Sequence, residues 1–564
     1  MALPDWLASR NGRLAAFFLL YVTEGLPLGF VVTAVATQLR RMGVGPADIG
    51  ALVAAFYLPW AFKWATGPLV DVFRSQRFGH RRAWILGTQA MMASTVLMLA
   101  AVPLPQALTL FIALLLVHNA FGATQDVAID ALAVDRLHAD ERGLAAGLMF
   151  AGAQVGQAVG GAGVLWVSGF IGFQWGYVLV PAAIASVSLA VVWPLREPPA
   201  PRIEGGWSAV RLEVKGFVEQ AFRAFLGSRP AFVGVLYALL PNGAMALGLA
   251  LQNNLAVELG FDDDAVALLA LVTTITGAVG MVAGGWVSDR LGRRRMLAIF
   301  LVLMSVPVAW LAWQLHLHGY GLPRPPGSAR VPELVRPLWI AAVSYAMAMG
   351  LMYGPRTAVF MDLTHPRVAA TQFTAYMAML NVAIAFAATW QGLVVEAWGY
   401  VVTLLIDAAV GLVSIPLLAL LRPVSPQAGS DAAAPRRARL ACTLLGLGCA
   451  AFTPWWWWRD PQGALVSLGN TVFTLLFVCS ALLLVAATLL QPMGHAARRA
   501  LRALALLLLV MYARRWAPAD AATLQGLIAA APLAGALALA ALSRQAWTAL
   551  SAPDAPAPAA VTGS

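Results

Sequence analysis

Long apolar stretches recur along almost the whole chain and limit what it can fold into. Each is about 18 or more residues long, enough for a helix to cross the roughly 30 Å hydrocarbon core of a bilayer. Of the 564 residues, 60% are hydrophobic and only 11% are Asp, Glu, Lys or Arg, whereas soluble domains carry about 25% charged residues. The sequence therefore predicts an all-α, polytopic membrane protein.

The apolar stretches form two groups of six and a shorter third group. The first six are expected at 13–36, 49–70, 83–102, 107–127, 143–168 and 174–195. The second six are expected at 231–252, 265–286, 296–316, 337–361, 371–394 and 399–421. Three or four more follow, at 440–457, 465–490, 501–516 and 523–542. The segment 501–516 is short and flanked by arginines, so it either spans marginally or lies in the interface.

This grouping predicts how the chain is divided into domains. The expected parts are an N-terminal six-helix bundle (1–195), a cytoplasmic loop (196–230), a C-terminal six-helix bundle (231–421), a linker (422–439), two to four additional transmembrane helices (440–545) and a disordered tail (546–564). Within the central loop, residues 207–226 place apolar and charged side chains at helical spacing, which predicts an amphipathic helix along the membrane surface. The segment 318–336 is rich in Pro and Gly and predicts an irregular outer loop.

The distribution of basic residues predicts the orientation and argues against other protein classes. Arginines concentrate in loops 71–82 and 289–295 and in the central loop, which puts these segments and the N-terminus in the cytoplasm. The net charge of +11 is then a topology signal, and no nucleic-acid partner is expected. The three cysteines lie in apolar runs without metal-ligand spacing, so neither a metal nor a cofactor is expected. The seven scattered histidines argue against an embedded enzyme.

One charged motif occurs twice. "GPLVDVFRSQRFGHRR" (67–82) and "GGWVSDRLGRRRM" (284–296) carry Gly, an apolar residue, Asp and clustered arginines in the same order, with Asp71 and Asp289 218 residues apart. A second pair, "AVDRLHADERGLAAG" (133–147) and "FMDLTHPRVAATQF" (360–373), places Asp135 and Asp362 227 residues apart. The near-equal offsets predict two parallel six-helix repeats, the layout of a major facilitator transporter.

The repeated acids and arginines predict a conformational clamp at the cytoplasmic ends of the helices. Ion pairs there would hold one of two rocking states, because they must break when the two bundles separate. The arginines alone could equally be topology anchors, but the retained Gly and Asp favour a clamp. The candidate clamp residues are Asp71, Arg81, Arg82, Asp135, Arg142, Asp289, Arg290, Arg293, Arg294, Asp362 and Arg367.

Several segments of residues 13–421 resemble one branch of the major facilitator superfamily. "LYVTEGLPLGF" (20–30), "LPWAFKWATGPLVD" (58–71), "FGHRRAWILGTQ" (78–89), "ATQDVAIDALAVD" (123–135) and "AATQF" (369–373) are similar to AmpG-type muropeptide permeases. They are almost equally similar to acetyl-coenzyme A transporters and to rhizobactin-type siderophore importers. The resemblance implies a monomeric, multi-pass transporter in a bacterial inner membrane. The AmpG-type relation implies proton-coupled import of an anionic glycopeptide, an anhydro-muropeptide, for peptidoglycan recycling.

Ionisable and polar residues inside the apolar spans are candidates for substrate binding or proton coupling. They are Glu24, Lys63, His118, Gln125, Asp126, Asp130, Gln154, Gln157, Arg356 and Asp407. Glu24 is either a protonatable carboxylate, a permanent partner of Lys63, or a carboxylate that accepts hydrogen bonds from the backbone. Lys63 either binds an anionic substrate or pairs with Asp126 or Asp130. Arg356 either binds an anionic substrate or extends toward the nearby cytoplasmic surface. Asp407 has no evident cationic partner in the sequence, so it is either neutral or satisfied by hydrogen bonds.

Overall fold

The structure is a computed structural model in which every described element is a helix or a short helical turn. The description leaves out residues 1–4, 45–51, 53–55, 57–58, 61–62, 76, 198–205, 262, 323–330, 425–428, 459–463, 514–521, 546 and 552–564. Among the residues described, nine helices are long and apolar enough to cross a membrane. Ten of the 22 residues of the predicted span 49–70 and part of the segment 318–336 fall outside the described residues.

The N-terminal half follows the predicted spans closely. Its helices are α1 (Arg10–Gly29), which continues as a π-helix into α2 (Ala36–Arg41), then α4 (Gly67–Val72), α5 (Arg81–Leu99), α6 (Leu108–Arg136), α7 (Arg142–Ala158), α8 (Val164–Ile171) and α9 (Gly176–Val187). The π-helical turn at Val159–Gly163 joins α7 directly to α8. The glycine-rich span predicted at 143–168 is therefore one membrane-length helical segment.

The C-terminal half departs from the predicted boundaries at three places. Its helices are α12 (Ala250–Glu258), α13 (Asp263–Leu291), α14 (Arg293–Leu317), α15 (Pro332–Leu363), α16 (Ala369–Val410) and α17 (Ile415–Leu418). Helix α15 begins inside the segment predicted as an irregular loop, because Pro332 suits the first turn of a helix. Gly399 has a φ of 78° and kinks α16 between the two predicted spans.

The third departure is a break in the span predicted at 231–252. Helix α11 (Arg229–Leu239) ends before Pro241, and α12 begins only at Ala250. Proline lacks an N–H for the helical ladder, and Gly243 takes a φ of 87°, which only glycine adopts readily. A continuous helix is therefore interrupted at membrane depth, and its backbone groups need other partners.

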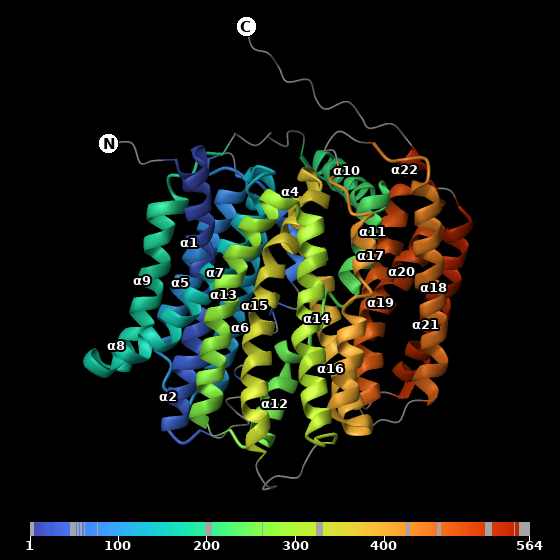
Figure 1. Cartoon of the computed structure of the whole chain (residues 1–564). Helices are drawn as coiled ribbons and strands as arrows, with labels where there is room; N and C mark the ends of the chain where they lie inside the picture. The colour runs from blue at the N-terminus through green and yellow to red at the C-terminus, as the bar shows by residue number, and fades with distance from the viewer. Residues whose placement is uncertain are drawn as a thin grey trace. The chain divides into compact units, whose positions relative to one another are not determined.

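Contacts divide the chain into two compact units. The first comprises Met1–Arg202, Leu240–Asn381 and Val394–Pro423. Within it α13 runs beside α15 (Figure 1), and α7 of the N-terminal half packs against α13 of the C-terminal half. A Cβ atom at Gly147 would lie 2.1 Å from the Met281 carbonyl oxygen, and one at Gly285 would lie 2.1 Å from the Gly143 carbonyl oxygen. Glycines thus let the two halves approach closely.

The second unit joins the central loop to the C-terminal helices. It contains α10 (Gly206–Leu226), α11, α18 (Ala434–Trp458), α19 (Ala464–Leu490), α20 (His495–Ala513), α21 (Ala522–Arg544) and α22 (Thr548–Ser551). Helix α10 matches the predicted amphipathic segment, and its Phe222 stacks on the fully buried Trp547 with ring centroids 5.0 Å apart. Arg437 donates to the carbonyl oxygens of Leu226 (2.6 Å) and Gly227 (2.8 Å).

These contacts correct two predicted boundaries. Helix α18 begins at Ala434, inside the predicted linker 422–439. The tail predicted to be disordered from 546 starts with the buried Trp547 and with α22. Both corrections have one cause: the apolar side of α10 provides a surface on which the flanking residues are buried. Short segments without a strong helical pattern of their own become ordered there.

Candidate functional site

A cluster of buried charges lies among the helices of the N-terminal half. Lys63 donates from Nζ to Asp126 Oδ2 at 2.7 Å. The Tyr21 hydroxyl donates to Asp130 Oδ1 at 2.5 Å. Glu24 lies near enough to Lys63, Asp126 and Asp130 to interact with all three charges. The four-residue spacing of Asp126 and Asp130 on α6 puts both carboxyl groups on the same side.

This cluster contains more acidic than basic groups. One ammonium group faces three carboxyl groups, and Oε2 of Glu24 is buried without a hydrogen-bond partner. Burying several carboxylates with one cation is costly unless a carboxyl group takes up a proton. The arrangement can therefore hold and release a proton. Within the described part of the chain, no group of three or more His, Cys, Asp or Glu residues could hold a metal ion.

The predicted polar residues around this cluster have different surroundings. Gln125 donates to the Thr23 hydroxyl at 3.2 Å, which places it beside the cluster. His118 lies apart from it, because its Nδ1 atom is 2.9 Å from the Thr95 hydroxyl and 3.2 Å from the Met92 carbonyl oxygen. Gln154 and Gln157 are half-buried on α7. The structure thus groups Gln125 with the charges and separates His118 from them.

The two buried charges of the C-terminal half lie in different environments. Asp407 accepts hydrogen bonds through Oδ2 from the backbone N–H groups of Met245 and Ala246, both at 2.9 Å. It therefore satisfies backbone donors that the break before α12 leaves free of the helical ladder. Arg356 is 6% exposed, and its guanidinium carbon lies 4.5 Å from the Tyr353 ring centroid.

Asp71 connects the two halves at the end of the first unit that carries the arginine loops, here called the basic end. It accepts hydrogen bonds from the N–H groups of Ala370 (3.1 Å) and Thr371 (2.8 Å), and from the Thr371 hydroxyl (2.8 Å). These donors are at the start of α16, where the first N–H groups have no partner within the helix. Arg81 forms an ion pair with the Asp71 carboxylate at 2.9 Å and a second one with the Asp135 carboxylate at 3.1 Å.

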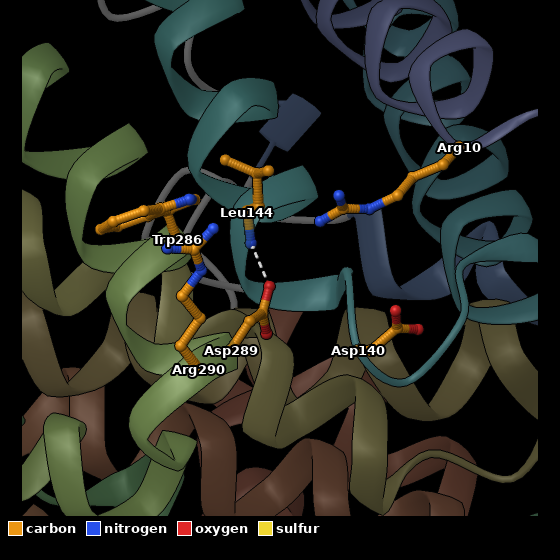
Figure 2. Close-up of a pocket in the computed structure, with 6 residues that line it drawn as sticks. All are labelled: Arg10, Asp140, Leu144, Trp286, Asp289 and Arg290. Atoms are coloured by element: carbon orange, nitrogen blue, oxygen red, sulfur yellow. Dashed lines mark hydrogen bonds between the residues drawn. The ribbon is translucent and has the colours of Figure 1, made fainter.

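Asp289 makes the equivalent contact in the opposite direction. It accepts hydrogen bonds from the N–H groups of Gly143 (3.0 Å) and Leu144 (2.8 Å) at the start of α7. Figure 2 shows the bond from Leu144 and the side chains of Arg10, Asp140, Trp286 and Arg290. Together with Leu144 and Asp289, these residues line a pocket of about 300 Å³. Each half therefore places an aspartate on the N-terminus of a helix in the other half, where a negative charge is favoured.

Ion pairs reinforce the Asp289 contact, although not every predicted clamp residue takes part. Arg293 bonds Asp289 at 2.9 Å and Asp362 at 2.8 Å, and Arg142 bonds Asp362 at 2.8 Å. Four predicted arginines make no ion pair to a carboxylate within the described residues: Arg82, Arg290, Arg294 and Arg367. The guanidinium of Arg82 donates to the Trp193 carbonyl oxygen, and that of Arg290 covers the Trp286 ring.

The basic end also contains a buried ion pair that the sequence analysis missed. Arg13 of α1 donates to both carboxylate oxygens of Glu141, at 2.5 and 3.0 Å, and to the Leu7 carbonyl oxygen at 3.1 Å. The two residues are 128 positions apart. Glu141 lies within the 133–147 segment, but Arg13 belongs to no repeated motif, so no sequence signal pairs them. In the loop 71–82, burial and the Arg81 charge lower the pKa of His80 to about 4, so its ring is neutral at pH 7.

Replacement of Arg13 by Ala is expected to lower the free energy of unfolding by about 3–5 kcal/mol, because it leaves a buried carboxylate without its partner. The Glu141 side chain is only 1% exposed. Arg10 is the matched control, since its side chain is 54% exposed and lies 3.8 Å from the same carboxylate. Arg10→Ala should cost less than about 1 kcal/mol. Thermal unfolding in detergent measures both, and equal effects would contradict the assignment.

Comparison with known families now supplies the context for this geometry. A model of the Major Facilitator Superfamily matches residues 14–251 and, again, residues 233–559. The chain belongs to the Major Facilitator Superfamily. It is a multi-pass membrane transporter and not an enzyme. The all-α major facilitator fold predicted from the sequence is confirmed.

Individual relatives support this membership. The anhydromuropeptide permease of Escherichia coli K12 is 27% identical over 426 residues, which cover 73% of this chain and 80% of the permease. The Rickettsia conorii protein AmpG 4 is 26% identical over 319 residues, 54% of this chain and 75% of that protein. They confirm the resemblance to the AmpG branch.

Solved transporters share the fold at low sequence identity. The proton:xylose symporter XylE aligns with a TM-score of 0.55 and 13% identity, over 74% of this chain and 98% of its own. A bacterial homologue of the iron transporter ferroportin, in an outward-facing state, aligns with a TM-score of 0.54 and 11% identity. The alignment covers 72% of this chain and 98% of the homologue's chain. At these identities the likeness shows the fold alone.

Proposed function

We propose that this transporter imports anhydro-muropeptides through the bacterial inner membrane into the cytoplasm, as a proton-coupled monomer. The observation that carries the proposal is the similarity to the Escherichia coli anhydromuropeptide permease along 80% of that protein's length. The cargo is an anionic glycopeptide, and its import returns cell-wall fragments for peptidoglycan recycling.

The buried carboxyl groups support proton coupling. Glu24, Asp126 and Asp130 share one ammonium group, so a proton entering this cluster lowers the cost of burying its charges. A group that gains a proton on one side of the membrane and loses it on the other can couple proton flow to substrate movement. We assign this role to Glu24 and Asp130, because Asp126 is paired with Lys63.

The basic end supports alternating access. In the structure, Asp71 and Asp289 hold the N-termini of α16 and α7, so the two halves are joined there. We infer that this end faces the cytoplasm and that its joined helices keep the transporter closed on that side. Release of substrate then requires both aspartates to leave the helix N-termini together with the ion pairs around Asp362.

Uptake by membrane vesicles tests cargo and coupling. Vesicles containing the transporter should accumulate radiolabelled GlcNAc-anhydroMurNAc-tripeptide against its concentration gradient. A protonophore should reduce that accumulation at least about tenfold, because losing about 1.4 kcal/mol of proton driving force lowers the inside-to-outside concentration ratio tenfold. Vesicles without the transporter are the control. Absence of saturable uptake would refute the cargo, whereas accumulation that is insensitive to the protonophore would refute the coupling.

A further inference from the structure

Arg356 differs from every other buried cation in the described residues. Arg13, Lys63, Arg81 and Arg437 each contact a carboxylate. Arg356 is 6% exposed, yet no described carboxylate lies within ion-pair distance of it, and its Nε atom has no hydrogen-bond partner. A buried cation without an anion is strongly unfavourable, and inside a membrane helix such a residue marks a functional position.

Aromatic rings connect Arg356 to the carboxylate cluster of the other half. The Tyr353 ring, which the Arg356 guanidinium covers, lies 5.0 Å from the Phe150 ring of α7. Phe150 lies 6.1 Å from the Tyr21 ring, and the Tyr21 hydroxyl donates to Asp130. A continuous row of three rings therefore lies between the cation of the C-terminal half and the acids of the N-terminal half.

Lys63, the other buried cation among the predicted binding residues, is poorly suited to binding an anion. The Lys63 ammonium is already bonded to Asp126 and faces Glu24 and Asp130 as well. An incoming carboxylate would meet this negative surplus. The Arg356 guanidinium has no such competitor, and its planar set of N–H donors matches a carboxylate in a bidentate arrangement. The Tyr353 ring supports the guanidinium from one face.

We propose that Arg356, with Tyr353 behind it, is the anion subsite of this transporter and binds a peptide carboxylate of the cargo. The guanidinium donates two hydrogen bonds to the two carboxylate oxygens. Phe150 and Tyr353 belong to different halves, so the rings that meet in the closed state separate when the halves rock apart. The identity of the anion as a muropeptide carboxylate rests on the proposed function, whereas the need for an anion rests on Arg356 alone.

Vesicle uptake of two probes tests the subsite. One probe is GlcNAc-anhydroMurNAc-tripeptide with free carboxylates, and the other is the same molecule with each carboxylate converted to an amide. Arg356→Gln should raise the KM for the acidic probe about 10- to 100-fold, the range for a lost charged hydrogen-bonding group, and leave the KM for the amidated probe within about twofold. The control Arg336→Gln removes an exposed arginine from the same helix and should change neither value.

Two results would overturn the subsite. One is a wild-type KM for the acidic probe in Arg356→Gln, and the other is an equal loss for both probes in a variant that remains folded. Arg356→Lys should recover part of the affinity, since it keeps the charge but not the bidentate geometry.

A measurement without cargo separates this inference from the proposed function. Arg356→Met should raise the thermal midpoint of the unliganded protein by about 2 °C or more, because it removes an uncompensated buried charge. A lower midpoint would show that the guanidinium has a structural partner and would overturn the inference. If wild-type vesicles take up no muropeptide, the cargo is wrong, and the midpoint of Arg356→Met still decides whether the position lacks an anion.

Discussion

Replacing Lys63 by Met is expected to reduce uptake about 100-fold and to lower the free energy of unfolding by about 3–5 kcal/mol. The substitution removes the ammonium group 2.7 Å from Asp126 and leaves three carboxyl groups together without a cation. Their mutual repulsion would keep protons bound at all times, so the cluster could no longer release a proton during the cycle. Vesicle uptake and thermal unfolding measure the two effects separately.

The double variant Lys63→Met with Asp126→Asn distinguishes a coupling pair from a purely structural one. Removing both charges of a buried pair is often nearly neutral for stability, so the double variant should recover most of the wild-type thermal midpoint. Its uptake should stay low, because the charges of Lys63 and Asp126 act on Glu24 and Asp130. Without these charges, proton binding by Glu24 and Asp130 should change. Recovery of uptake together with stability would mean that the pair only holds the helices in place.

Asp289→Asn is expected to lower uptake about tenfold while keeping most of the stability. Asparagine has nearly the same shape, but it carries no charge and has one acceptor oxygen for the N–H groups of Gly143 and Leu144. A lost charged hydrogen bond costs about 1.5–3 kcal/mol, which shifts a two-state equilibrium about tenfold or more. The closed state should therefore lose population, and the basic end should open more often.

Cysteine labelling can detect this opening directly. Met281 packs where α13 meets α7 and is 5% exposed. In a background with the native cysteines replaced by serine, Met281→Cys should react about tenfold faster with a membrane-impermeant maleimide when Asp289→Asn is present. Glu333→Gln, an exposed acid at the start of α15, is the control. Unchanged labelling in Asp289→Asn would contradict the clamp.

Much of the fold followed from patterns that are local in the sequence. Span length and hydropathy predicted the helices, because a segment in a bilayer must satisfy its own backbone hydrogen bonds. The near-equal spacings of Asp71 to Asp289 and of Asp135 to Asp362 predicted the two halves. The break before Ala250 was missed because apolar composition continues through Pro241 and Gly243. The start of the tail was missed because the burial of Trp547 depends on α10.

The candidate site was predictable in its residue types but not in its partners. The sequence marked Asp71 as a clamp residue and proposed arginines as its partners, whereas the structure adds the backbone of Ala370, 299 positions away. Every helix N-terminus has N–H groups without a partner in the helix, whatever its residues. No residue type in the sequence therefore identifies the N–H groups that Asp71 binds. Pairing of Lys63 with Asp126 instead of Asp130 likewise depends on the packing of side chains from different helices.

Helix length, hydropathy and repeat spacing can be read along the chain, so they predict a helical membrane protein of two repeated halves with charges at matching positions. Which buried charges are compensated could be found only from the packed helices. In the packed structure, Lys63 and Arg13 each form an ion pair with a carboxylate. Asp407 accepts hydrogen bonds from two backbone N–H groups, whereas Arg356 has no anionic partner among the described residues. Compensation depends on distances of a few ångströms between helices far apart in sequence, and those distances exist only once the helices are packed.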